Sequence, residues 1–200
     1  MKNTLQPITT LNPINSHSLK LRGEDATVEL RFLEHDILGV SGSILVNTPP
    51  AALWQALTEY DNLHNTLPKV VLSRLVSREQ GSVVLEQTGK TGIFFFEITV
   101  RFRLKVKEEP FDSIAFEQVD GDFSIYRGHW KLEPAEGCLC TLLTYSAEIR
   151  PDFFAPSFLV AFVQRQDLPE ILKAHKKRAE SLWREQEREE ERKQQQNLLS

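Results

Sequence analysis

Cysteine is almost absent from this chain, and Cys138 and Cys140 are the only two among 200 residues. On a strand they would share one face, because side chains two positions apart point the same way. That spacing suits neither a disulfide nor a four-ligand zinc site. We therefore expect two small strand residues in a protein of a reducing compartment.

Long hydrophobic runs are missing as well, since no stretch approaches the roughly 20 apolar residues that span a bilayer. The first ten residues, MKNTLQPITT, hold no continuous apolar segment, so we expect no signal peptide and a cytoplasmic protein. A surplus of positive charge is also absent: the net charge is −4 and the pI about 5.8, which argues against nucleic acid as the main partner. The composition, 40% hydrophobic and 26% charged, is that of an ordinary soluble globular domain.

Recognisable catalytic patterns are lacking too. The sequence shows no Ser-His-Asp pattern, paired carboxylates or metal-ligand cluster at familiar spacing, and no glycine-rich phosphate loop after a strand. Among the histidines only His64, after the first helix, is expected to edge a pocket, and His175 is assigned to the polar part of the last helix. We predict no catalytic residue, no metal site and no cofactor.

The strongest positive signal is the segment FFFEITVRFRLKVK, residues 94–107. Apolar and charged side chains alternate along it with a period of two, which indicates a strand with one apolar and one charged face. It is far longer than the usual strand of about five or six residues. A strand of this kind belongs to an antiparallel sheet with one covered face.

The remaining periodicities supply the rest of the sheet and its cover. A strand pair and two short helices come first, then six strands joined by short turns, then one long helix from Pro156 that Pro169 should kink. The expected strands are residues 28–32, 37–46, 70–77, 83–87, 94–107, 114–119, 123–132 and 138–149, and the first helices are residues 51–60 and 61–68. Consecutive strands with short turns form an antiparallel meander, and only the last helix is long enough to cover it.

These elements predict an α+β fold: an antiparallel sheet with two short helices and a long C-terminal helix packed over it. We divide the chain into a loose N-terminal leader (residues 1–23), a folded domain (24–183) and a charged, solvated C-terminal extension (184–200). The extension has no apolar heptad, so a coiled-coil partner is not expected.

Several short motifs occur in an order that resembles one protein family. They are WQALTEYD at 54–61, LPKV at 67–70, GDF at 121–123, GHWKL at 128–132, LTY at 143–145 leading to Arg150 and Pro151, and DLPEILKA at 167–174. Together, across residues 38–183, they resemble the START-like helix-grip (SRPBCC) superfamily. The likeness is to its coenzyme Q-binding and polyketide cyclase/dehydrase branch, and within that branch to plant and cyanobacterial members.

The resemblance implies a helix-grip fold, in which a curved antiparallel sheet surrounds the C-terminal helix, and makes residues 24–183 a START-like ligand-binding domain. It also implies an apolar tunnel between sheet and helix, since members of the superfamily bind sterols, phospholipids, quinones, hormones or polyketide intermediates. Inward-facing apolar and aromatic side chains should line it. The residues expected to contact ligand are Phe96, Val100, Phe102, Leu104, Tyr126, Trp130, Tyr145, Phe158 and Phe162. Tyr126 or Tyr145 would supply a polar anchor, and the loop from Arg150 to Pro156 a gate.

The function expected first is binding, with transport, of a hydrophobic small molecule such as a lipid, an isoprenoid quinone or a pigment precursor. An enzyme of the aromatase/cyclase type stays open, and it would need an ionisable group deep in the cavity. Glu86, if buried, would be a candidate general base, although a solvated Glu86 is expected.

A ribosome-associated interaction module, which resembles what some bacterial relatives do, is the third hypothesis. Transient contact with a membrane surface is a further expectation, because Arg101, Arg103, Lys105 and Lys107 form a basic outer strip. The oligomeric state is left undefined.

Overall fold

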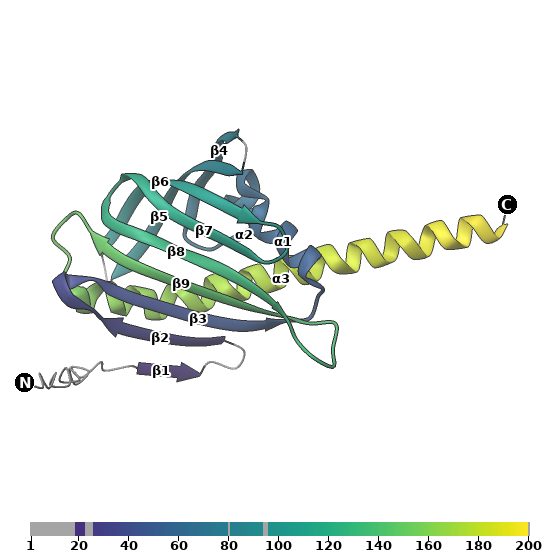
Figure 1. Ribbon diagram of the computed structural model, residues 1–200, viewed down its shortest axis with the longest axis horizontal. Coiled ribbons are helices and arrows are strands. Elements are labelled where there is room, and N and C mark those ends of the chain that lie inside the picture. The colour runs from purple at the N-terminus through teal and green to yellow at the C-terminus, as the bar shows by residue number, and fades with distance from the viewer. Residues whose placement is uncertain (1–18, 23–25, 80, 94–95, 200) are drawn as a thin grey trace, which may run out of the picture.

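A computed structural model describes residues 19–22, 26–79, 81–93 and 96–199 (Figure 1). Its strands are β1 (Leu19–Arg22), β2 (Ala26–Phe32), β3 (Leu38–Val46), β4 (Val70–Glu79), β5 (Ser82–Ile93), β6 (Phe96–Glu109), β7 (Ser113–Gly121), β8 (Phe123–Pro134) and β9 (Thr141–Pro151). Its helices are α1 (Pro50–Thr58), α2 (Leu63–Thr66) and α3 (Ser157–Leu199), with short 3-10 turns at Glu34–Asp36 and Tyr60–Asn62.

The strands form one antiparallel sheet in the order β1-β2-β3-β9-β8-β7-β6-β5-β4. The segment from β4 to β9 is a meander, and the two short helices connect β3, an inner strand, to β4, the edge strand at the far end of the sheet. Figure 1 shows the curved sheet with α3 running across one face. The predicted α+β helix-grip fold is confirmed. β1 falls within the stretch expected to be a loose leader, while residues 1–18 lie outside the described part.

The long strand that dominated the sequence is β6, and it extends over 14 residues. Leu104 and Val106 are buried, whereas Arg101 and Lys105 are exposed on the other face. A register shift in its pairing with β7 occurs between Arg103 and Leu104, which is the signature of a β-bulge. Such bulges bend a strand, so this one contributes to the curvature that opens space beneath the sheet.

Helix α3 covers the sheet unevenly. It packs against α1, β2 and β3, with Leu168 and Leu172 fully buried. At Gly42 on β3 a side-chain Cβ would lie only 3.0 Å from the methyl groups of both leucines, so the missing side chain permits this close approach. The strands further along the sheet, β6 to β8, are left farther from the helix, and a cavity lies beneath them.

The C-terminal half of α3 leaves the body of the protein, as Figure 1 shows in yellow. The helix is continuous through Pro169 over its 43 residues. Beyond Trp183 the described side chains are mostly exposed. Among the described residues, no helix combines the length and apolar character needed to cross a bilayer.

The cysteine prediction is wrong in one respect. Cys138 and Cys140 lie in the β8–β9 hairpin loop and are paired as a disulfide, with Cα atoms 5.2 Å apart. The alternation rule applies only to extended strands, and here the chain turns at Gly137, whose φ is +78°, before β9 begins at Thr141. In a turn, side chains two positions apart can converge.

The junction of α1 and α3 gives a first testable prediction. The Arg178 guanidinium donates to both carboxylate oxygens of Glu59 at 2.9–3.0 Å, and both side chains are about three-quarters buried. Arg178→Ala should therefore lower the free energy of unfolding by about 1–2 kcal/mol, measured by urea denaturation. Arg184→Ala, at an exposed position whose one hydrogen bond is to a backbone carbonyl, is the control and should change it by less than about 0.5 kcal/mol. Equal effects of the two variants would contradict this.

Candidate functional site

A cavity of about 460 Å³ lies between the sheet and α3. Its wall comes from strands β4 to β9, the α1–α2 region between Leu57 and Pro68, the loop from Pro151 to Ala155 and one face of α3. Most of the wall is aliphatic or aromatic. Aliphatic side chains from the sheet and helix include Leu85, Ile98, Val100, Leu104, Ile114, Leu159, Val163 and Ile171. A cavity of this size falls within the range of small-molecule sites.

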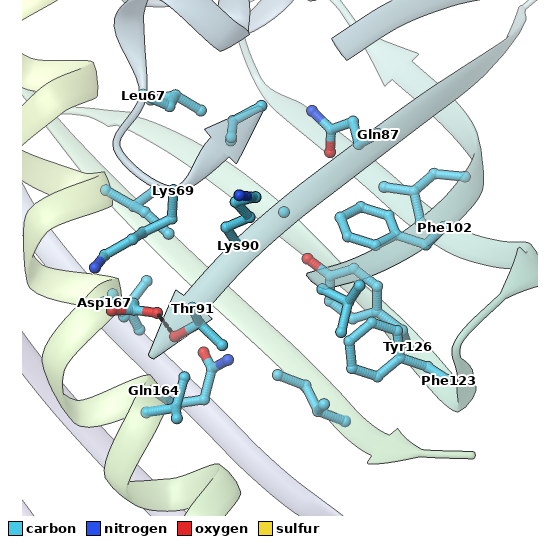
Figure 2. Close-up of a pocket in the computed structure, with 18 of the residues that line it drawn as sticks. Leu67, Lys69, Gln87, Lys90, Thr91, Phe102, Phe123, Tyr126, Gln164 and Asp167 are labelled. Atoms are coloured by element: carbon cyan, nitrogen blue, oxygen red, sulfur yellow. Dashed lines mark hydrogen bonds between the residues drawn. The ribbon is translucent and has the colours of Figure 1, made fainter. Parts of the chain in front are cut away.

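Aromatic rings from β6, β7, β8 and β9 form one end of the cavity. The Tyr126 ring has three ring neighbours at centroid distances of 5.2 Å, namely Phe102, Phe116 and Phe123. Edge and tilted arrangements such as these are the favoured geometries of aromatic pairs. Figure 2 shows Phe102, Phe123 and Tyr126 side by side at this end. They are held in place by the sheet, since cross-strand neighbours share a face.

Two tyrosine hydroxyls meet in the wall. The oxygens of Tyr126 and Tyr145 are 3.5 Å apart, within hydrogen-bond distance. Burial raises the pKa of Tyr126, and it raises the pKa of Tyr145 well above its ordinary value. Both phenols are therefore neutral at any physiological pH, and each keeps its proton available for hydrogen bonding.

His175 also lines the cavity, although the sequence analysis assigned it to a polar stretch. It is 3% exposed and its ring stands edge-on to Trp130 at a centroid distance of 5.1 Å. The spacing of residues along the helix could have predicted this. Four residues at three- and four-residue intervals are all buried: Leu168, Leu172, His175 and Ala179. The prediction that His64 edges the pocket is wrong, because His64 is exposed and lies outside the lining.

Polar side chains gather at another part of the wall, where β5 passes α3. The Thr91 hydroxyl donates to Asp167 Oδ2 at 2.7 Å, the contact drawn in Figure 2. Lys69, Lys90 and Gln164 lie around this pair, and the Lys69 side chain runs toward α3 on the side of Asp167. Lys69 has a positive φ of 66°, and its carbonyl accepts the Lys90 N–H at 2.7 Å, which fixes the turn that presents both lysines. We call these five residues the polar cluster.

The structure brings six of the nine predicted contact residues to one cavity wall: Val100, Phe102, Leu104, Tyr126, Trp130 and Tyr145. The side chain of Phe96 lies outside the described residues. Phe158 and Phe162 do not line the cavity and are 64% and 39% exposed, so the expectation that they face inward is wrong. They share one face of α3, and the turn of the helix places their neighbours Leu159 and Val163 against the cavity instead.

Several charged side chains on the outer face of the sheet form ion pairs. Glu86 accepts hydrogen bonds from Arg74 and Arg103, and the Arg103 bond is the main reason that its pKa is lowered. Arg127 pairs with Glu148, and Lys131 with Asp112. Glu86 is therefore solvated and ionised, as expected, and is no general base. These ion pairs reduce the positive charge available to an RNA backbone, so this face does not favour the interaction-module hypothesis.

A curved antiparallel sheet that grips a long C-terminal helix around an internal cavity defines a START-like protein. Residues 46–176 match the sequence model of the family described as "Polyketide cyclase / dehydrase and lipid transport". The chain belongs to this family. No curated protein sequence matches it.

Solved structures share the fold at low identity. The Zhui aromatase/cyclase from Streptomyces sp. R1128 is 14% identical, with a TM-score of 0.63 over 72% of this chain and 94% of that one. A STAR-related lipid transfer protein from Xanthomonas axonopodis is 15% identical, with a TM-score of 0.65 over 82% and 98%. Human STARD10 is 13% identical, with a TM-score of 0.64 over 81% and 72%. The likeness to all three is one of fold.

Proposed function

We propose that this protein binds, and carries, a hydrophobic small molecule such as a lipid, an isoprenoid quinone or a pigment precursor, in the cavity between the sheet and α3. The observation that carries the proposal is an apolar cavity of about 460 Å³ with polar side chains confined to a few places in its wall. Apolar surface transferred from water into such a cavity stabilises a complex by roughly 25 cal/mol per Å². The lipid transfer proteins that share the fold support the same proposal.

The direct test is to purify the protein from its own host and examine it by native mass spectrometry. We expect a bound apolar molecule that is released on denaturation and recovered by solvent extraction. A protein that carries no such molecule, and that takes up no apolar fluorophore when one is added, would overturn the proposal.

Transport requires the cavity to exchange its content, and the loop before α3 is the segment best placed for that. Phe153, Phe154 and Ala155 all line the cavity, yet Phe154 is 96% exposed. Phe158, on the first turn of α3, is exposed beside them. Exposed aromatic side chains at a cavity mouth are suited to insertion among lipid head groups. Lys69, in the same cavity wall, is suited to anionic lipid, whereas Lys90 is already paired with Glu97 at 2.7 Å. We therefore place a transient membrane contact at this rim.

Phe154→Asp should weaken co-sedimentation with mixed phosphatidylcholine–phosphatidylglycerol vesicles by roughly tenfold, since it replaces an inserting ring with a charge. The matched control is Leu139→Asp, which places the same charge at a 62% exposed leucine in the β8–β9 loop, at the opposite end of the sheet (Figure 1). The control should bind vesicles like the native protein. Equal loss in both variants would point to a general charge effect and contradict a localised rim.

One observation favours a second candidate, an enzyme of the aromatase/cyclase type. The cavity wall includes His175, whose ring contacts Trp130, so an ionisable group is present among the apolar residues. The Zhui aromatase/cyclase shares the fold. Incubation with a stabilised polyketide mimic, followed by mass spectrometry, should show loss of water if the protein cyclises and dehydrates it. An unchanged mimic that nevertheless binds would favour the carrier.

A further inference from the structure

The imidazole of His175 is a buried polar group in the cavity wall. Its Nδ1 is buried and has no hydrogen-bond partner among the described residues. A buried polar atom without a partner is unfavourable, and native proteins retain few of them. The ring also lines the cavity, so a small rotation of the side chain toward the cavity would let a ligand supply that partner.

One aromatic ring, that of Trp130, links the tyrosine pair to this imidazole. The centroid of the Trp130 ring lies 4.6 Å from the ring centroid of Tyr145 and 5.1 Å from that of His175. In the hydrogen bond between Tyr126 and Tyr145 only one hydroxyl donates, so the other proton remains free. His175, Tyr126 and Tyr145 together thus offer at least two hydrogen-bond positions in an aromatic surrounding.

This group differs from the polar cluster in charge. The lysines and the carboxylate of the described wall belong to the polar cluster, and Asp167 lies eight residues before His175 on α3, about 12 Å along the helix axis. Burial lowers the pKa of His175 to about 4, so its imidazole is neutral near pH 7. A charged ligand group placed beside three neutral, buried side chains would lose its hydration with no opposite charge to replace it.

We infer that His175, Tyr126 and Tyr145 form a recognition site for an uncharged oxygen, a carbonyl or hydroxyl, on the buried end of the ligand. The inference rests on the proposed function and narrows its ligand class. An oxygen-bearing apolar molecule enters with its neutral oxygen toward the imidazole. Any charged or strongly polar end lies toward Lys69 and Asp167. A purely hydrocarbon ligand end, or one ending in a carboxylate, is disfavoured at this position.

The test uses two fluorescent probes of nearly equal shape: the ketone propionyl-dimethylaminonaphthalene, and the propyl analogue in which CH₂ replaces the carbonyl. We expect the native protein to bind the ketone more tightly. His175→Leu should weaken ketone binding by roughly tenfold and leave binding of the propyl analogue unchanged. His175→Gln, whose amide again donates and accepts, should recover part of the ketone affinity.

The outcomes separate this inference from the proposed function. If neither probe binds the native protein, the proposed function fails. If both bind and His175→Leu weakens them equally, the cavity is real but the oxygen site is not. A measurement on the native protein covers the case in which His175→Leu does not fold: the infrared carbonyl stretch of the bound ketone, labelled with carbon-13, should fall relative to its value in heptane. An unshifted stretch would overturn the inference.

Discussion

Gly89→Trp is expected to reduce binding of the naphthyl ketone on the order of a hundredfold while the fold is retained. Gly89 lines the cavity from β5 and pairs with Val100 on β6, whose side chain also lines it. A Cβ at Gly89 would meet its nearest neighbours, Val100 Cγ2 and the Lys69 carbonyl, at 3.5 and 3.7 Å, which is ordinary contact. The new side chain would therefore point into the cavity without displacing backbone.

The size of the effect follows from the space available. A tryptophan side chain covers about 150–250 Å² of surface when buried, and the cavity that it would enter measures about 460 Å³. A ligand would have to compete with an indole that is covalently held in place. Because the indole is itself apolar, it fills empty volume in the folded protein, and we expect the melting temperature to stay the same or rise.

The matched control is Thr88→Trp, one residue earlier on the same strand and therefore on the opposite face. Thr88 is half-buried and is not part of the cavity wall. This variant adds the same ring to the same strand and should bind the ketone like the native protein. Undiminished ketone binding by Gly89→Trp, in a folded protein, would show that the probe binds elsewhere and would remove the main support for the proposed function.

The sheet could be predicted from the sequence because its signal is local. Alternation along residues 96–107 defines both faces of β6 whatever lies next to it, and short turns between strands imply antiparallel neighbours. The covering helix followed from length alone. None of these arguments depends on the distance between helix and sheet, and that distance decides whether a cavity exists. The cavity lies on the β6–β8 side because α3 approaches the other side of the sheet closely at Gly42, and that approach is a long-range contact.

Individual site residues were predictable where a strand sets their direction and less so on the helix. Tyr126, Trp130 and Tyr145 follow from a period of two. On α3, six consecutive apolar residues, Phe158 to Val163, extend over more than one full helical turn, so sequence alone does not define the rotation of the helix. His175 was missed because residue type was weighed above position. Lys173 and Lys177, two positions away on either side, are exposed, whereas His175 faces the protein interior.

His175 also predicts how stability changes with pH. Its pKa is about 4 in the folded protein, as burial disfavours the charged ring, and 6.5 is the ordinary value. Between these values the unfolded chain binds more protons than the folded protein, so stability falls as pH decreases from about 6.5 to 4. Each pKa unit corresponds to about 1.4 kcal/mol, so this histidine should contribute a loss of about 3 kcal/mol over that interval.

The loss can be isolated by comparing variants, since every other titrating group, including Lys69, Lys90 and Asp167 in the same wall, is common to them. Tyr126 and Tyr145 stay neutral throughout this range because their pKa values are raised. The free energy of unfolding, measured in urea at pH 7 and pH 4, should therefore fall by about 3 kcal/mol more for the native protein than for His175→Leu. His129→Leu, at an exposed position on the outer face, is the control and should behave like the native protein. If the native protein and His175→Leu lose stability in parallel, the imidazole is reached by water or by a partner, and it is no longer the vacant, neutral group on which the oxygen site depends.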